Sequence, residues 1–382
     1  MPSPIWDELH GQAEAVTQLE TAIKNRESGV HHAWLFTGPP GSGRSNMARA
    51  FAAALLCEHG GCSTCQSCQL VMAGGHPDVL VLATEKVVIP IEEIRELVSS
   101  SIMGSTMGRY KIMIVEDADR MAERSSNVLL KSLEEPPKGT IWMLCAPSEA
   151  DLLPTIRSRV RRVALKVPSV REVADLLIKR DSVDEKLALQ VAAEAQSHVG
   201  MARRLAESSE ARSRRRETLL SALNIKGLSS AMFTAERWLN IAAKDAEALT
   251  AERDAEERQR LMVTFGLDDS SPIPAQLRTE FKKLEEDQKR RATRSLRDGI
   301  DRILVDLMSL YRDALMLQLS AKVDLVNEEQ RAQIETLAKE FDSAKTIRIL
   351  DSIALTRTRI ASNVKDQVAL DALAVELRRG NS

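Results

Sequence analysis

The chain of 382 residues has few aromatic side chains, almost no net charge and no long apolar run. Phe, Trp and Tyr make up 3% of the residues, which leaves little material for stacking on unpaired bases. The formal net charge is −2, so contact with nucleic acid would require a local basic patch. No apolar run approaches the roughly 20 residues of a membrane helix, and the N-terminus lacks the basic and apolar regions of a signal peptide. These absences predict a cytoplasmic protein.

The residues that are abundant favour helices and more than one apolar core. Hydrophobic residues make up 43% of the chain and charged residues 28%, and Ala, Leu, Arg and Glu are common. A chain of this length can form two or three domains. In a reducing cytoplasm its five cysteines are expected to be metal ligands or buried thiols rather than disulfides. Cys145 lies in an apolar run and is expected to be a small buried hydrophobe.

A glycine-rich stretch at residues 38–45 (GPPGSGRS) organises the first half of the chain. It follows the apolar run 33–36 and precedes a helical pattern at 47–55, which is the context of a phosphate-binding loop. In such a loop, backbone N–H groups turn toward the phosphates and the helix N-terminus adds its partial positive charge. Arg44 stands where the loop lysine is expected, and a planar guanidinium fits less easily between phosphates than an ammonium group does. Whether ATP binds is therefore left open.

Acidic residues follow a second apolar run, at residues 111–115. In ATPases of this type, carboxylates at the end of such a strand manage Mg²⁺ and the attacking water. Here the usual Asp-Glu order is reversed to Glu116-Asp117. Further strands are predicted at 78–82, 140–145 and 163–167, with helices at 91–101 and 125–135 between them. This alternation predicts a parallel sheet with helices on both faces.

Four cysteines lie within twelve residues, and the last three follow one another at C-x-x-C spacing: Cys57, Cys62, Cys65 and Cys68. Each thiolate can reach one corner of a tetrahedron while the short connections fold back, so the spacing favours a structural zinc site. A redox pair and an iron–sulfur cluster are the alternatives.

The rest of the chain is predicted to be helical. We expect an α/β domain at 1–167, a small helical lid at 168–210 and an all-α domain at 211–382, with a charged insertion at about 244–297. That insertion, interrupted by a loop with Pro272 and Pro274, is expected to form long exposed helices or a mobile segment. The arginines at 212–216 are expected to form a solvated helix face. An apolar stripe at residues 300–314 and a second between 347 and 373 must be buried, either within the domain or against partner subunits.

Several of these motifs together resemble the delta prime family of subunits of the bacterial DNA polymerase III clamp loader, within the AAA+ superfamily. The resemblance covers residues 5 to about 204 well, and the C-terminal third only by its helical character. It implies an AAA+ module, a helical lid and a helical collar that joins gamma/tau and delta subunits in a hetero-pentameric ring. Such a ring uses ATP to load the sliding clamp on primed DNA. The segments that carry the resemblance are 11–12 (GQ), 33–45, the cysteine cluster, 76–78 (HPD), 108–111 (GRYK), 116–119 (EDAD), Asn127 with 129–137 (LLKSLEEPP), and 155–159 (TIRSR).

The resemblance also assigns residues to sites. Arg159 is expected to act as an arginine finger on a neighbouring subunit's ATP, and Arg203 to be the sensor arginine of the lid. The cysteines would hold Zn²⁺. The residues predicted for the nucleotide site are Gly38, Gly41, Gly43, Arg44, Ser45, Glu116, Asp117 and Arg203.

Departures from the family pattern predict that this chain turns over little ATP itself. Besides Arg44 and the reversed acidic pair, Ala146 and Pro147 stand where active members carry a polar sensor, and Val160 replaces a cysteine. We therefore expect a stator that donates Arg159 while another subunit of the holoenzyme polymerises DNA. An active motor resembling gamma/tau is the alternative. A zinc-dependent nucleic-acid-binding protein is disfavoured by the low charge and the few aromatics.

Overall fold

The computed structural model describes residues 3–7, 9, 11–26, 30–84, 86, 88–265, 267, 273–274, 277–362 and 364–379. The chain divides into two compact units, Met1–Ala206 and Glu207–Ser382, and each has its own apolar core. Pro272, part of the loop expected in the charged insertion, lies outside the described residues. None of the described helices combines the length and apolar character needed to cross a membrane.

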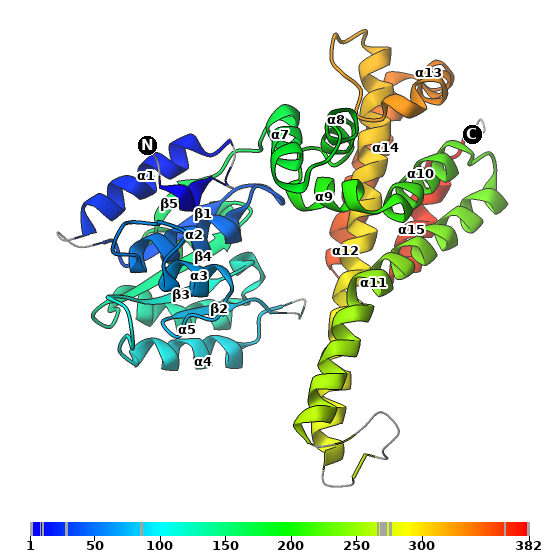
Figure 1. Ribbon diagram of the computed structural model, residues 1–382. Coiled ribbons are helices and arrows are strands. Elements are labelled where there is room, and N and C mark those ends of the chain that lie inside the picture. Colours follow the sequence, from blue (N-terminus) through cyan, green and yellow to red (C-terminus); the bar gives the residue numbers. More distant parts are fainter. Residues whose placement is uncertain are drawn as a thin grey trace. The chain divides into compact units, whose positions relative to one another are not determined.

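A parallel five-stranded sheet forms the centre of the first unit (Figure 1). The strand order is β2-β3-β4-β1-β5, and every residue of β1, β3 and β4 is buried because helices cover both faces. The predicted α/β sheet is confirmed. Strand β1 lies between β4 and β5. The loop that follows β1 is therefore at the carboxyl edge of the sheet, where parallel α/β sheets bind ligands. The strands are β1 (Ala33–Thr37), β2 (Val79–Leu82), β3 (Lys111–Val115), β4 (Thr140–Ala146) and β5 (Arg161–Ala164).

Alternate side chains of the central strands pack into two separate cores. Trp34 and Phe36 of β1 belong to one, where the rings of Trp34 and Phe51 meet edge to face with centroids 5.0 Å apart. Leu35 and Trp142 belong to the core on the other face. The helices of this layer are α1 (Ala13–Lys24), α2 (Arg44–Leu56), α3 (Gln66–Met72), α4 (Ile91–Ile102), α5 (Glu123–Glu134) and α6 (Pro154–Arg157), with 3-10 turns η1 (Pro4–Trp6), η3 (Ala118–Arg120) and η4 (Glu149–Asp151).

Three helices complete the first unit: α7 (Val170–Asp181), α8 (Glu185–Glu194) and α9 (Val199–Glu207). A capping box starts α7, because the Ser169 hydroxyl accepts from the Glu172 N–H while the Glu172 carboxylate accepts from the Ser169 N–H. We call α7–α9 the lid.

The second unit is entirely helical in the part that the structure describes. The apolar stripe predicted at 300–314 is buried on α12, as expected, whereas Ile347, Val364 and Val368 of the later stripe are 48%, 37% and 56% exposed. These three positions are therefore not buried within the domain, since only one face of these helices meets the core, and their burial against partner subunits stays a prediction. The helices are α10 (Ser209–Leu223), α11 (Leu228–Thr264), α12 (Arg278–Gln318), α13 (Arg331–Glu340), α14 (Ser343–Ala361) and α15 (Asp366–Glu376), with a 3-10 turn η6 (Glu328–Gln330).

The arginine cluster of α10 forms the predicted solvated face only in part, since Arg216 is exposed and Arg215 is buried. Arg215 is 7% exposed, and its guanidinium donates to Asp306 at 3.0 Å and to the side chain of Asn327. Arg214 forms an ion pair with Asp245. The expectation was wrong for Arg215 because partners distant in sequence compensate the cost of burying its charge.

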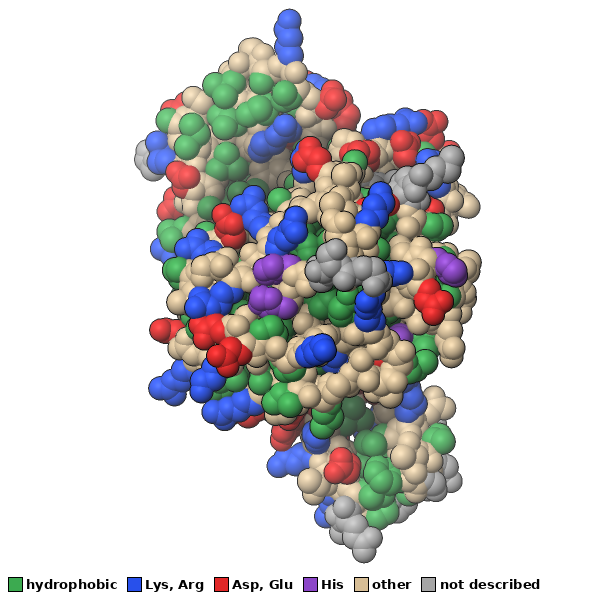
Figure 2. Space-filling model, turned by 90° about the vertical axis from the view of Figure 1, so that its left-hand side faces the viewer, with side chains coloured by type: hydrophobic (Ala, Val, Ile, Leu, Met, Phe, Trp, Pro, Cys, Tyr) green, Lys and Arg blue, Asp and Glu red, His purple; other side chains and the backbone are tan. Residues whose placement is uncertain are grey.

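The charged insertion consists of the distal parts of α11 and α12, which lie side by side in Figure 1. Arg291 is 8% exposed and pairs with Asp254 and, at 2.9 Å, with Glu257 on the facing helix. Phe281 and Met262 are also buried. Of the two forms expected, long helices are the one observed. Figure 2 shows one face of the molecule, where acidic and basic side chains are interspersed.

Candidate functional site

The loop between β1 and α2 has the backbone of a phosphate-binding loop. Gly41 and Gly43 take φ angles of 83° and 87°, a region that side chains with a Cβ rarely adopt, and Gly43 directly precedes α2. A Cβ on Gly41 would lie 2.4 Å from Cγ of His198, at the start of α9. The loop therefore needs glycine at residue 41 both for its conformation and for the close approach of the lid.

Arg44 turns back into the loop. One of its Nη atoms donates to the carbonyl oxygen of Gly38, and the other lies 3.8 Å from a carboxylate oxygen of Asp117. The side chain is 13% exposed. A guanidinium offers donors in a planar fork, so it can serve these two acceptors together, whereas an ammonium group acts as a point charge.

Both acidic residues after β3 are also paired with arginines. Glu116 accepts from Arg49 of α2 at 3.0 Å, and Asp117, whose φ angle is 50°, lies 3.8 Å from both Arg44 and Arg120. Burial raises the pKa of neighbouring Asp119, and the charge of Asp117 adds to this rise. A metal ion would have to compete with these arginines for the carboxylate oxygens.

A cavity of about 380 Å³ lies between the loop and the lid, entirely within the first unit. Gly41, Gly43, Arg44 and Ser45 line it from the loop, and Arg203 lines it from α9; the sequence had predicted all five. Gly38, Glu116 and Asp117 are outside its lining. The lid adds residues that sequence reasoning missed, and apolar side chains complete the wall: Glu172, Arg180, His198, Leu9, Pro168, Val173 and Leu176.

Two arginines of the cavity share one carboxylate. Asp181 lies 2.9 Å from Arg180 and 3.7 Å from Arg203, and the hydrogen bonds from Arg180 lower its pKa. No motif marks Arg180 in the sequence, because it becomes part of the site only when α7 packs beside the loop. Gln12, by contrast, belonged to a predicted motif; its amide donates to Lys166 O at 2.8 Å and accepts from Lys166 N–H at 3.0 Å.

The position after β4 has no polar side chain, as the sequence predicted. Ala146 is buried at the end of that strand, and the carbonyl of Pro147 accepts from Gly38 N–H at 3.1 Å. Cys145 is 1% exposed, which confirms the expected buried thiol, and burial raises its pKa to about 12.

Arg159 lies apart from the cavity, just after α6. Its Nη2 atom is 2.6 Å from a carboxylate oxygen of Glu134, and its Nη1 atom donates to Thr155 O at 2.8 Å and to Ser158 Oγ at 3.0 Å. The side chain remains 35% exposed. All three partners of Arg159 belong to its own chain, and the side chain stays partly accessible to a further partner.

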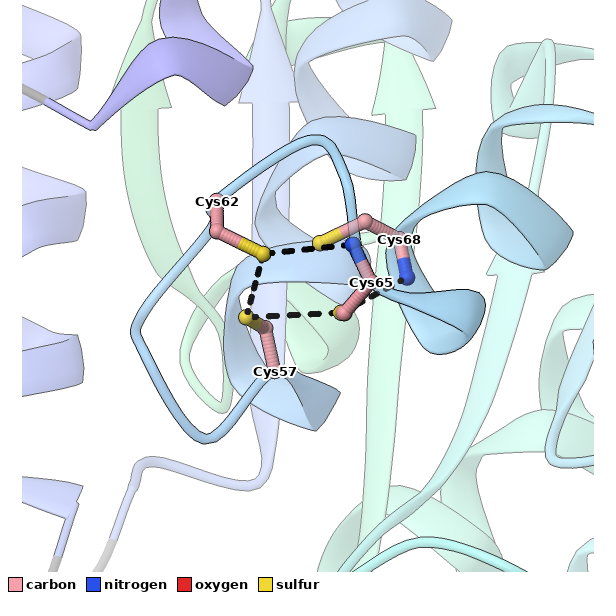
Figure 3. Close-up of side chains that lie close together, drawn as sticks. All are labelled: Cys57, Cys62, Cys65 and Cys68. Atoms are coloured by element: carbon pink, nitrogen blue, oxygen red, sulfur yellow. Dashed lines mark hydrogen bonds between the residues drawn. The ribbon is translucent and has the colours of Figure 1, made fainter.

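The four clustered cysteines converge on one point between α2 and α3 (Figure 3). All four Sγ atoms lie within 4.8 Å of one another, and Cys57 Sγ lies 3.6 Å from that of Cys62 and 3.7 Å from that of Cys65. Four sulfurs at about 2.3 Å from a tetrahedral zinc would be about 3.8 Å apart, so the cluster fits a metal ion. Cys57 and Cys68 are buried, while Cys62 and Cys65 are partly exposed.

Backbone N–H groups stabilise negative charge on the sulfur atoms of this cluster. The N–H of Cys65 lies 3.3 Å from Cys62 Sγ, and the N–H of Cys68 lies 3.5 Å from Cys65 Sγ. Hydrogen bonds from the hydroxyl and N–H of Thr64, with that from Cys65, lower the pKa of Cys62 to about 5. Burial raises the pKa of Cys68 instead. A divalent cation would stabilise all four thiolates together.

The sheet order, the phosphate loop and the lid define the class of this protein as a parallel α/β module with a phosphate-type loop and a helical lid, followed by an all-helical unit. The family model described as DNA polymerase III, delta subunit, matches residues 11–169, and that of its C-terminal part matches 292–376. The chain belongs to this family of DNA polymerase III subunits.

Curated relatives point to the same complex. The chain is 34% identical over 197 residues to the DNA polymerase III subunit delta' of Pseudomonas aeruginosa, covering 48% of this chain and 56% of that protein. It is 37% identical over 144 residues to the delta' subunit of Escherichia coli, covering 36% and 43%. Identity to subunit tau/gamma of Haemophilus influenzae is 30% over 171 residues, covering 44% and 24%. The chain thus spans about half the length of its delta' relatives.

Proposed function

We propose that this chain is a delta prime-type subunit of a DNA polymerase III clamp loader, which acts as a stator and supplies Arg159 to a neighbour's ATP. The family and the two delta' relatives support membership of the complex. The partners would be gamma/tau and delta subunits in a pentameric ring that loads the sliding clamp on primer-template DNA.

The pairing of both acidic residues with arginines is the observation that carries the stator role. Glu116 is bound to Arg49, and Asp117 is shared by Arg44 and Arg120. Phosphoryl transfer depends on carboxylates that hold Mg²⁺ and on a group that orients water. With these carboxylates neutralised and apolar Ala146 at the sensor position, turnover in this subunit should be slight. The tau/gamma-like motor remains the alternative, and the same experiments test it.

Nucleotide binding without turnover fits the cavity. Its volume of about 380 Å³ lies within the range of small-molecule sites, and the loop, Arg180 and Arg203 supply groups for phosphates. Leu9, Pro168 and Leu176 offer an apolar wall for a base. Calorimetric titration of the purified chain with ATP, with and without Mg²⁺, tests this part of the proposal.

Arg159 would leave Glu134 when a neighbouring ATP presents its γ-phosphate. The ion pair is partly exposed and therefore weak, whereas a phosphate offers a bidentate partner with more charge. An arginine supplied in trans accelerates phosphoryl transfer by about 10³–10⁵ in well-studied systems. Because other sites of the ring keep their own arginines, the whole assembly should lose less.

Reconstituted rings with Arg159→Ala test the finger, and Arg157→Ala is the matched control. Arg157 is an exposed residue of the same segment, so Arg157→Ala removes the same positive charge as Arg159→Ala. We expect normal assembly of both variants by light scattering. DNA-stimulated ATP turnover and clamp loading should fall with Arg159→Ala alone. Equal turnover by the two intact rings would show that Arg159 is not a finger.

For the cysteine cluster we propose one structural Zn²⁺ held by Cys57, Cys62, Cys65 and Cys68. The four Sγ atoms and their spacing support a closed tetrahedral site, which leaves no position for substrate. The ion would fasten the connection between α2 and α3. Iron–sulfur and redox chemistry are distinguished from zinc by metal analysis and by the absence of a visible absorption band.

A further inference from the structure

The distal part of α12 carries a basic surface that the proposed function does not use. On a helix, residues advance by about 100°, so seven of the eight cations of residues 278–297 fall within about 160° of the circumference, and Arg291 is the exception. Glu286 is the one acid of residues 278–297 in that sector. We call this surface the basic stripe: Arg278, Lys282, Lys283, Lys289, Arg290, Arg294 and Arg297.

Internal pairing within the α11–α12 hairpin leaves much of the stripe facing solvent. Two acids of α11, Asp254 and Glu257, bind Arg291 on the buried side of α12. Within the stripe, Arg290 pairs with Glu286 and Asp287, and Arg294 lies 3.8 Å from Asp298, so the lysines are its main solvent-facing cations. Lys282, Lys283 and Lys289 are exposed, and no described carboxylate lies within 4.0 Å of their Nζ atoms.

The dimensions of the stripe match a nucleic acid backbone. Residues 278–297 span about 28 Å at 1.5 Å per residue. Duplex DNA presents one negative charge per about 1.7 Å of its axis, and neutralising these charges releases counterions. A band of cations along one side of a helix is therefore complementary to a run of phosphates.

The same surface lacks the features needed by other anionic partners. Among the described residues of 278–297 no large apolar side chain is exposed, so nothing would insert into a lipid surface. The aromatic side chain there, Phe281, is 2% exposed and cannot stack on an unpaired base. These observations favour a double-stranded backbone over a membrane or a single strand.

We propose that the basic stripe of α12 binds the phosphate backbone of double-stranded DNA without sequence preference. Five of the seven stripe residues lie outside both segments matched by the family models, while Arg294 and Arg297 lie within the second. The binding requires neither nucleotide nor assembly with other subunits.

The test is the affinity of the full chain for a short labelled duplex, measured by fluorescence anisotropy between about 50 and 200 mM salt. The variant combines Lys282→Gln, Lys283→Gln and Lys289→Gln, which suit a helix and remove three positive charges. The matched control combines Lys322→Gln, Lys339→Gln and Lys365→Gln, three exposed lysines of the same unit. Circular dichroism checks that both variants stay folded.

We expect the stripe variant to lose about tenfold or more in affinity and up to about 2.7 from the slope of log K against log salt, at about 0.9 per phosphate contact. The control should bind as the wild type does. Equal affinity of wild type and stripe variant would overturn the proposal, as would tighter binding to a single strand. Tighter binding to polyglutamate of matched charge would assign the stripe to an acidic protein instead. Normal ring assembly by the stripe variant separates this result from the proposed stator role.

Discussion

The close approach of Gly41 to the lid predicts a large destabilisation by Gly41→Ala. An alanine there must adopt a φ angle of 83°, and its Cβ would lie 2.4 Å from Cγ and 2.9 Å from Cα of His198. The left-handed conformation costs about 1–2 kcal/mol. Relief of the overlap by a shift of the lid adds about 1–3 kcal/mol, as in overpacked cores. We therefore expect the unfolding free energy of the first unit to fall by about 2–5 kcal/mol.

Gly74→Ala is the matched control for this prediction. Gly74 has a φ angle of 75°, close to that of Gly41, but nothing lies within 4 Å of a Cβ built there. Gly74→Ala should therefore lower the unfolding free energy only by the conformational cost of about 1–2 kcal/mol. The difference between the two variants therefore measures the packing of the loop against the lid.

Urea denaturation followed by tryptophan fluorescence provides the assay, in a Trp238→Phe background. Trp238 is the tryptophan of the second unit, so its removal restricts the signal to Trp6, Trp34 and Trp142 of the first. Adding His198→Ala should restore part of the loss, since the overlap with the imidazole ring disappears while the backbone of residue 198 stays close to the added methyl group. Equal losses for Gly41→Ala and Gly74→Ala would refute the close approach of the lid.

Three further predictions concern the loop and the cysteines. Arg44→Lys alone should leave ATP turnover well below about 1 s⁻¹ in a steady-state assay, because Glu116 stays paired with Arg49; turnover near that rate would contradict the degenerate site. Purified protein should contain one zinc per chain by mass spectrometry, and Cys65→Ser with Cys68→Ser should abolish it; retained zinc would place the ion elsewhere. In metal-free protein Cys62 should be alkylated first. Because the pKa of Cys62 is lowered to about 5, this side chain is a thiolate at any pH above that value. The alkylation rate of Cys62 should therefore fall only when the pH drops through 5, whereas an ordinary thiol already loses its thiolate at neutral pH.

Local patterns in the sequence were sufficient to predict the sheet and most of the phosphate loop, although the last strand was predicted at 163–167 and lies at Arg161–Ala164. These patterns are local because each involves only a few neighbouring residues. They are the short apolar runs of buried strands, the glycines between strand and helix, and the clustered cysteines. Gly41, Gly43, Arg44 and Ser45, which such patterns predicted for a nucleotide site, all line the cavity.

Side-chain partners distant in sequence were not predictable in this way. Arg49 and Glu116 are 67 residues apart, and Arg215 and Asp306 are 91 apart. A cluster such as 212–216 gives no sign of which arginine is buried, because that depends on how α10 packs against α12. The same limit hid Arg180, which reaches the cavity only through the packing of the lid.

The two arginine–carboxylate pairs beside the loop also constrain how this subunit can evolve. Exchange of Arg44 would release Asp117 from one partner but leave Glu116 bound to Arg49, and exchange of Arg49 would do the reverse. Neither single change also places a polar side chain at Ala146, so under the proposed stator role no one step would give selection a hydrolysing subunit to act on. A lineage with these pairs would then be held in the proposed role, and motor activity would return more readily through replacement by a duplicated motor gene than through reversal.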